Sequence, residues 1–271
     1  MTNLSRRPTS GATSAVEHTP KGQHSVHAAP PVLCRAALSE LMDGSPAASR
    51  MDGRVYITGT GRAGTTFLVD LLTRAGLDTG LGPERTDAAH FPDARAGLEK
   101  DIFDRNGPEI IKNPRLCDQL DAVLKSGITI RHILIPIRDF KSAAASRRFV
   151  QQAATGSDQG KPVRGGLWGT RSGASQEAVL HEKFSTLMEA IARNDIPFTL
   201  LSFPRLARDG PYLFGKLQPC FPDLVEKDFL LTFEQTAQPD MIHEFPSALR
   251  ENGNAKAGFA DWLRFRVRRP R

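Results

Sequence analysis

One short segment near residue 60 constrains the fold more than any other part of the chain. A run of β-branched and aromatic residues, 55–57, leads into the glycine-rich sequence 59–64, and apolar residues then recur at helical spacing up to residue 75. The run is typical of a buried strand, and the glycines permit the tight turn that follows it. The segment therefore predicts a strand, a tight turn and a helix in direct succession.

The same alternation continues along the chain. Further apolar runs predict strands at 110–111, 128–137 and 198–203. Apolar residues at helical spacing predict helices near 116–124, 143–150, 180–191 and 213–217. Strands that are apolar throughout, separated by helices, favour a parallel sheet covered on both faces. We expect a three-layer α/β fold of the P-loop type, with a central parallel sheet flanked by helices.

The first 50 residues differ from the rest. They are rich in Ser, Thr, Ala, Pro and Gly and show no sustained period, so they predict a disordered leader. An organelle targeting segment, or a true start at Met51, would explain the same composition. Residues 51–271 then form one α/β domain. The leader also accounts for part of the low hydrophobic share of the chain, which is 39%.

Composition narrows the function classes only partly. The chain has 36 Lys and Arg against 30 Asp and Glu, and this excess suits nucleic acid, anionic membranes or phosphorylated small ligands. No window approaches 18 uninterrupted apolar residues, which argues against a membrane-spanning helix. Cys34, Cys117 and Cys220 lie far apart, which excludes a disulfide framework and favours a reducing compartment, the cytoplasm.

The glycine-rich turn has the composition of a phosphate-binding loop. Glycines let the backbone approach an anion, and the N-terminus of the following helix adds free N–H groups and a positive dipole end. Thr65 and Thr66 supply hydroxyl groups, and Arg62 supplies a charged two-pronged donor. A purely structural turn is the alternative. We expect the segment to hold a phosphate.

The match to the ATP-binding loop is incomplete. Gly59, Gly64 and Thr66 occupy the expected positions, but Thr65 stands where the Lys that contacts the β- and γ-phosphates should be. That Lys stabilises the transferring phosphoryl group, so its loss speaks against ordinary ATP chemistry.

A second candidate half-site follows the strongest predicted strand. Arg138 comes directly after the apolar run, and Ser146 stands eight residues later, two turns into the next helix. Strand ends in a parallel sheet face the ligand crevice, where a guanidinium and a hydroxyl can hold a second phosphate. The alternatives are a local ion pair between Arg138 and Asp139, or Asp139 as a magnesium ligand.

Both half-sites resemble motifs of the sulfotransferases that use 3′-phosphoadenosine-5′-phosphosulfate. Residues 62–68 resemble the family's 5′-phosphosulfate loop, which reads Lys or Arg, any residue, Gly, Thr, Ser or Thr, Trp or Phe, Leu. Arg138 and Ser146 resemble its 3′-phosphate pair, although Phe140 stands where the family usually has Pro. The resemblance implies this set of donor-binding residues: Arg62, Ala63, Gly64, Thr65, Thr66, Phe67, Arg138 and Ser146.

Two further segments, 111–116 and 203–206, resemble the bacterial and carbohydrate-type branch of the family, so the likeness spans about residues 54–206. The first contains Lys112 and Arg115, which either line the pocket or are solvated surface charges. The resemblance implies transfer of a sulfuryl group to a hydroxyl or amine of a carbohydrate or small metabolite. No metal is expected.

The chemistry implied by the resemblance assigns Arg62 to the departing oxygen, as an electrostatic stabiliser that cannot act as an acid. A general base must take the acceptor proton. Glu84 follows Arg62 by about twenty residues, similar to the base of tyrosylprotein sulfotransferases, and is the expected base. The other acidic or basic residues of this stretch stay open as alternatives: Asp87, His90, Asp93 and Glu99.

The sequence leaves the roles of two segments undecided. Residues 153–174 predict a long loop, either a lid over the acceptor or a plain surface loop. The tail 264–271 interleaves Arg with apolar residues, which suits contact with nucleic acid or an anionic membrane, or a solvated tail. The alternatives to a sulfotransferase are a P-loop kinase or NTPase and a basic nucleic-acid-binding protein, but no nucleic-acid partner is expected.

Overall fold

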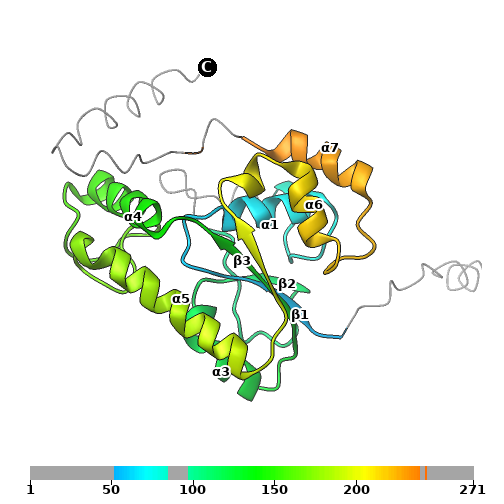
Figure 1. Ribbon diagram of the computed structural model, residues 1–271, viewed down its shortest axis with the longest axis horizontal. Helices are drawn as coiled ribbons and strands as arrows, with labels where there is room; N and C mark the ends of the chain where they lie inside the picture. Colours follow the sequence, from blue (N-terminus) through cyan, green and yellow to red (C-terminus); the bar gives the residue numbers. More distant parts are fainter. Residues whose placement is uncertain (1–51, 85–96, 239–241, 243–271) are drawn as a thin grey trace, which may run out of the picture. The chain divides into compact units, whose positions relative to one another are not determined.

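The structure is a computed structural model that describes residues 52–84, 97–238 and 242, all within one compact unit, Met51–Arg271 (Figure 1). The predicted leader, 1–50, lies outside the described residues, and so does the basic tail, 264–271. Both expectations stay predictions.

A parallel sheet forms the centre of the unit. Within the described residues it has four strands, in the order β2-β1-β3-β4. Their bounds are β1 (Arg54–Ile57), β2 (Ile110–Lys112), β3 (Ile130–Ile137) and β4 (Phe198–Ser202). Tyr56 on β1 pairs with Ile111 of β2 on one side and with Ile133 of β3 on the other. The strand that precedes the glycine-rich turn therefore lies inside the sheet.

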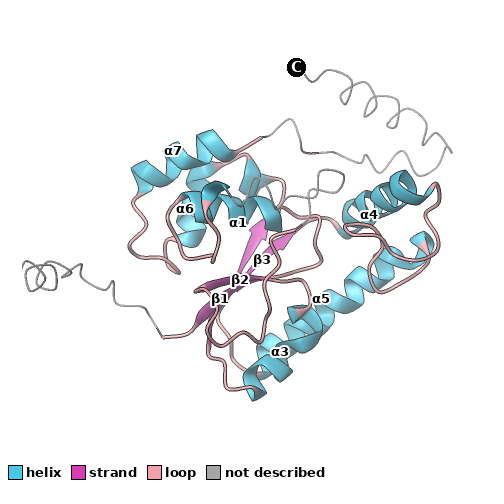
Figure 2. Ribbon diagram, turned by 180° about the vertical axis from the view of Figure 1, so that it is seen from behind, coloured by secondary structure: helices cyan, strands magenta, loops and turns pink. Residues whose placement is uncertain are grey.

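Helices cover both faces of this sheet (Figures 1 and 2). One face carries α1 (Thr65–Arg74), α6 (Gly210–Leu217) and α7 (Glu226–Thr236). The other carries α3 (Leu116–Lys125) and α5 (Gln176–Arg193), and α4 (Phe140–Thr155) packs on α5. Two short 3-10 turns, Gly173–Ser175 and Arg205–Ala207, complete the elements. The predicted three-layer α/β fold is confirmed.

Alternation along the strands divides the core between the two faces. Val55 and Ile57 pack with α1, α6 and α7, whereas Tyr56, between them, packs with α3 and α5. All three side chains are fully buried, which explains the continuous run of apolar and aromatic residues at 55–57. The Tyr56 hydroxyl donates to the carbonyl of Ile102 at 2.9 Å, so its polar atom is satisfied. Each such side chain stabilises the fold by about 1.5–3 kcal/mol.

The strand order places a topological switch point beside β1. The chain leaves β1 for β2 on one side and later returns to β3 on the other, so the connections after β1 and β3 diverge. Ligands of open α/β sheets bind at such a switch point, at the carboxyl ends of the strands. Both predicted half-sites follow these two strands.

The helix after β3 is longer than the sequence suggested. The predicted helix covers 143–150, but α4 begins at Phe140 because Asp139 caps it, accepting a hydrogen bond from the backbone N of Ser142 at 2.9 Å. The side chain of Asp139 also accepts from the Ser142 hydroxyl. These bonds give Asp139 the role of a helix cap.

Candidate functional site

The β1–α1 loop, residues 58–64, has an unusual backbone. Gly59, Gly61 and Gly64 have φ of 130°, 70° and 84°, and Arg62 also has a positive φ, 56°. α1 begins at Thr65 without a side-chain cap from Gly64. The N–H groups of its first turn therefore have no capping partner from that residue, and they form the kind of helix end that binds anions.

Two of these glycines are required by close packing. A Cβ on Gly59 would lie 3.0 Å from the carbonyl oxygen of Pro136 in β3. A Cβ on Gly64 would lie 3.1 Å from the side chains of Phe203 and Leu206, in the turn after β4. The loop is held between the ends of β3 and β4, and this contact fixes where its backbone amides lie.

The structure brings the two predicted half-sites together. The guanidinium of Arg62 donates from Nε to Ser146 Oγ at 3.0 Å, and Arg138 donates from Nη1 to the carbonyl of Arg62 at 3.3 Å. The Arg138 guanidinium also lies 5.1 Å from the centre of the Phe203 ring. Ser146 is buried on α4. Residues that are 76 and 84 positions apart in sequence thus meet at one edge of the sheet.

A third arginine, Arg147, joins this group, and sequence reasoning missed it. It is 7% exposed and donates to two backbone carbonyls, Thr60 at 2.7 Å and Gly166 at 2.9 Å. Burial, together with the nearby charge of Arg62, lowers the pKa of Arg147 to about 9. The signal was its place on the buried face of α4, in helical register with Ala143 and Val150.

The loop also contains an unsatisfied hydroxyl. Thr60 is 1% exposed, and its Oγ1 has no hydrogen-bond partner among the described residues. Buried polar atoms are normally paired, so an unpaired donor beside a cluster of cations favours a bound anion or water as its partner. Thr58, two residues earlier, is 3.6 Å from the Cys117 sulfur through its own hydroxyl.

A buried lysine, Lys112, is the last residue of β2. Lys112 donates from Nζ to the carbonyl of Gly97 at 2.6 Å and forms an ion pair with Glu99. Burial lowers the pKa of Lys112, and Glu99 opposes that effect. Lys112 is therefore a buried residue and not one of the solvated surface charges that the sequence left open.

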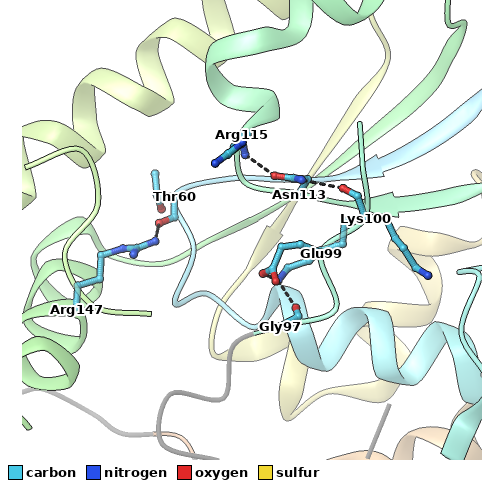
Figure 3. Close-up of polar contacts among 8 residues, drawn as sticks. Thr60, Gly97, Glu99, Lys100, Asn113, Arg115 and Arg147 are labelled. Atoms are coloured by element: carbon cyan, nitrogen blue, oxygen red, sulfur yellow. Dashed lines mark hydrogen bonds and ion pairs between the residues drawn. The ribbon is translucent and has the colours of Figure 1, made fainter. Parts of the chain in front are cut away.

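Its neighbour in the segment, Arg115, is exposed. Its backbone N donates to Asn113 Oδ1 at 2.9 Å, and Asn113 in turn donates to the carbonyl of Lys100 at 2.8 Å (Figure 3). These bonds fix the turn between β2 and α3, and the Arg115 side chain lies at the surface.

The predicted base and its alternatives are only partly described. Glu84 is exposed and is the last described residue before the gap at 85–96. Three of the alternatives lie in that gap, outside the described residues: Asp87, His90 and Asp93. Glu99 is described and paired with Lys112. The assignment of Glu84 stays a prediction.

The α4–α5 loop, residues 156–172, is held by buried amide side chains. Gln151 of α4 is fully buried; its Nε2 donates to the carbonyl of Lys161, and its Oε1 accepts from the N–H groups of Val163 and Leu167. Gln176 of α5, also fully buried, bonds both backbone groups of Trp168. The loop that the sequence offered as a lid is therefore anchored at several points.

Two findings concern the described residues alone. No group of three His, Cys, Asp or Glu side chains in this part of the chain is arranged to hold a metal ion. No helix in the same residues combines the length and the apolar character needed to cross a membrane.

Comparison with known proteins gave one similar solved structure. No protein-family model matches the chain, and no curated protein matches it. The chain is similar to the sulfotransferase domain of the olefin synthase from Synechococcus PCC 7002, at a TM-score of 0.38 and 12% identity, over 75% of this chain and 85% of that one. The function proposed below rests on the residues of the site and not on this likeness.

Proposed function

We propose that the protein is a sulfotransferase that transfers a sulfuryl group from 3′-phosphoadenosine-5′-phosphosulfate to a hydroxyl or amine of a carbohydrate or small metabolite. The observation that carries the proposal is the meeting of the two half-sites. The loop residue Arg62 contacts Ser146 directly and Arg138 through its carbonyl, although the sequence separates them widely.

The chemistry of the residues fits a donor with two anionic ends. Three guanidinium groups gather here, those of Arg62, Arg138 and Arg147, together with the unpaired hydroxyl of Thr60. Arginine is suited to phosphate and sulfate because its planar fork donates two parallel hydrogen bonds. We assign the 5′-phosphosulfate to the loop and the first turn of α1, contributed by Arg62, Ala63, Gly64, Thr65, Thr66 and Phe67.

We assign the 3′-phosphate to Arg138 and Ser146. When bound, the donor supplies a sulfuryl group joined to phosphate through an anhydride oxygen, and that oxygen departs as an anion. Arg62 stabilises the departing charge electrostatically, by donating hydrogen bonds from its guanidinium, and does not act as an acid. Each charge-assisted hydrogen bond of this kind contributes about 1.5–3 kcal/mol.

On the acceptor side, Glu84 is the proposed base that takes the proton of the attacking hydroxyl, with Asp87, His90, Asp93 and Glu99 as the alternatives. Glu99 is paired with the buried Lys112 at the end of β2. Glu84→Gln tests the assignment, and Glu99→Gln tests the one alternative that is described, because loss of the true base lowers kcat while leaving donor affinity unchanged.

The proposed compartment is the cytoplasm. The described cysteines, Cys117 and Cys220, are both free and buried, which suits a reducing environment. The third, Cys34, lies outside the described residues.

Calorimetric titration with 3′,5′-adenosine bisphosphate tests the proposal. We expect the nucleotide to bind the wild type. Arg138→Ala should weaken the affinity at least tenfold, because a hydrogen bond from a charged donor contributes about 1.5–3 kcal/mol. Ser146→Ala removes a neutral donor and should weaken the affinity less. Arg148→Ala, on the same helix, is the matched control and should bind like the wild type. If the wild type does not bind 3′,5′-adenosine bisphosphate, the proposal is wrong. Magnesium-dependent binding of ATP would favour a kinase instead.

A further inference from the structure

The buried cation on α4 connects two loops that are far apart in sequence. The Arg147 guanidinium donates through Nη2 to the carbonyl of Thr60 in the β1–α1 loop, and through Nη1 to the carbonyl of Gly166 in the α4–α5 loop. Figure 3 shows the bond to Thr60. A guanidinium has its donors in one rigid plane, so a fixed Arg147 fixes both carbonyls relative to each other.

Close packing holds this guanidinium in place. A Cβ on Gly61 would lie 2.5 Å from Arg147 Nη2, so the β1–α1 loop lies directly against the cation. On the other side, Arg147 Cζ lies 5.1 Å from the centre of the Trp168 ring. Gln176 holds the backbone N–H and carbonyl of Trp168 at 2.7 and 3.1 Å. A movement of the α4–α5 loop is therefore transmitted to the β1–α1 loop.

The charge of Arg147 is not compensated within the described residues. Its guanidinium contacts two neutral carbonyls and an aromatic face, no carboxylate there pairs with it, and its Nε has no hydrogen-bond partner. The nearby charge of Arg62 is of the same sign. A buried charge without a counter-charge is unfavourable, and an anion bound at the loop would relieve this repulsion.

We propose that Arg147 is a positioning residue that couples anion binding at the β1–α1 loop to the order of the α4–α5 loop. The proposal rests on the proposed function, in that the β1–α1 loop is taken as the donor site. Arg147 fixes the Thr60 carbonyl and thereby the direction of the neighbouring N–H groups. Its Nη1 anchors the α4–α5 loop through the carbonyl of Gly166. Donor binding strengthens both contacts, and loosening either loop weakens donor binding.

The test measures ligand affinity and backbone protection in the full chain. Arg147→Lys keeps the charge, but an ammonium is a point donor without the planar fork that joins the two carbonyls. Trp168→Leu loosens the contact from the side of the α4–α5 loop and leaves the β1–α1 loop unchanged. Arg148→Lys is the matched control, because it makes the same change one residue along α4.

We expect at least a tenfold weaker affinity for 3′,5′-adenosine bisphosphate in Arg147→Lys and a smaller loss in Trp168→Leu, with Arg148→Lys like the wild type. Hydrogen exchange at the Leu167 and Trp168 amides should slow when the wild type binds the nucleotide. In Arg147→Lys at saturating nucleotide this slowing should be lost, which a merely structural role would not produce.

Nucleotide affinity equal to the wild type in both variants overturns the coupling, as does unchanged protection of the two amides in Arg147→Lys. Failure of the wild type to bind the nucleotide overturns the proposed donor instead. Inorganic phosphate is then the probe for the coupling: it should protect Leu167 and Trp168 in the wild type and not in Arg147→Lys, and equal protection in the two proteins overturns the proposal.

Discussion

Substitution of Gly61 by Ala tests how firmly the β1–α1 loop is held against Arg147. Gly61 has φ of 70°, and an added Cβ would lie 2.5 Å from Arg147 Nη2. The end of an arginine usually moves aside at little cost. Here the guanidinium is buried and donates to the carbonyls of Thr60 and Gly166, so the methyl group must displace the 2.7 Å bond to Thr60.

The expected destabilisation has two sources. A left-handed backbone at a residue with a Cβ costs about 1–2 kcal/mol, and loss of a charge-assisted hydrogen bond costs about 1.5–3 kcal/mol. Gly61→Ala should therefore lower the free energy of unfolding by about 2.5–5 kcal/mol. Gly156→Ala is the matched control: Gly156 has φ of 77°, and its Cβ would meet nothing within 4 Å. That variant should lose only about 1–2 kcal/mol.

Urea unfolding followed by circular dichroism measures both losses. If Gly61→Ala and Gly156→Ala lose the same free energy, the guanidinium moves freely and the reasoning is wrong. The comparison is sharpened in an Arg147→Met background, where the obstacle to the methyl group is removed. There the difference between the two glycine variants should disappear.

Three further predictions concern pH, the α4–α5 loop and metals. Burial and the charge of Arg131 lower the pKa of His132 from its usual value of 6.5. As the pH falls below 6.5, the unfolded chain therefore takes up the proton before the folded chain does, and the free energy of unfolding decreases. The urea midpoint should fall between about pH 7.5 and about pH 5.5, and it should fall less in His132→Asn. Gln151→Leu should lower the free energy of unfolding by about 2–4 kcal/mol, because three backbone groups of the α4–α5 loop lose their partner. In the same urea assay the control Gln152→Leu, at an exposed position, should change little. Treatment with EDTA should leave binding of 3′,5′-adenosine bisphosphate unchanged in calorimetry, and a clear loss would mean that a metal belongs to the site.

Local patterns predicted the central part of the fold. The buried stretches of β1 and β3, residues 55–57 and 133–136, are continuous apolar runs and were recognisable without any tertiary information. The helix start at Thr65 was recognisable for a similar reason, because glycines mark the turn before it. The positions of Arg62 and Arg138 followed, since each comes just after a strand of the parallel sheet.

Features that depend on tertiary contacts were not predictable in this way. α7 was missed because its buried residues, Phe229 and Phe233, are separated by polar positions and give a weak pattern. The sequence analysis did not single out Arg147, because its contacts with the β1–α1 loop and with Trp168 depend on the tertiary structure. The bond between Arg62 and Ser146 joins the two half-sites more closely than the sequence pattern indicated.

The long sequence separation of the site contacts has a consequence for how the site comes into being. Ser146 accepts a hydrogen bond from Arg62 of the β1–α1 loop across 84 residues, and Arg147 donates one to Thr60 across 87 residues. Contacts of this range form only after the entropy of closing a long loop has been overcome, here by pairing β1 with β3. A peptide covering residues 55–75 contains the whole glycine-rich motif but none of the side chains that orient it. The arrangement of these side chains around the loop, and with it the proposed anion site, is therefore a property of the folded unit and is lost when β1 and β3 separate.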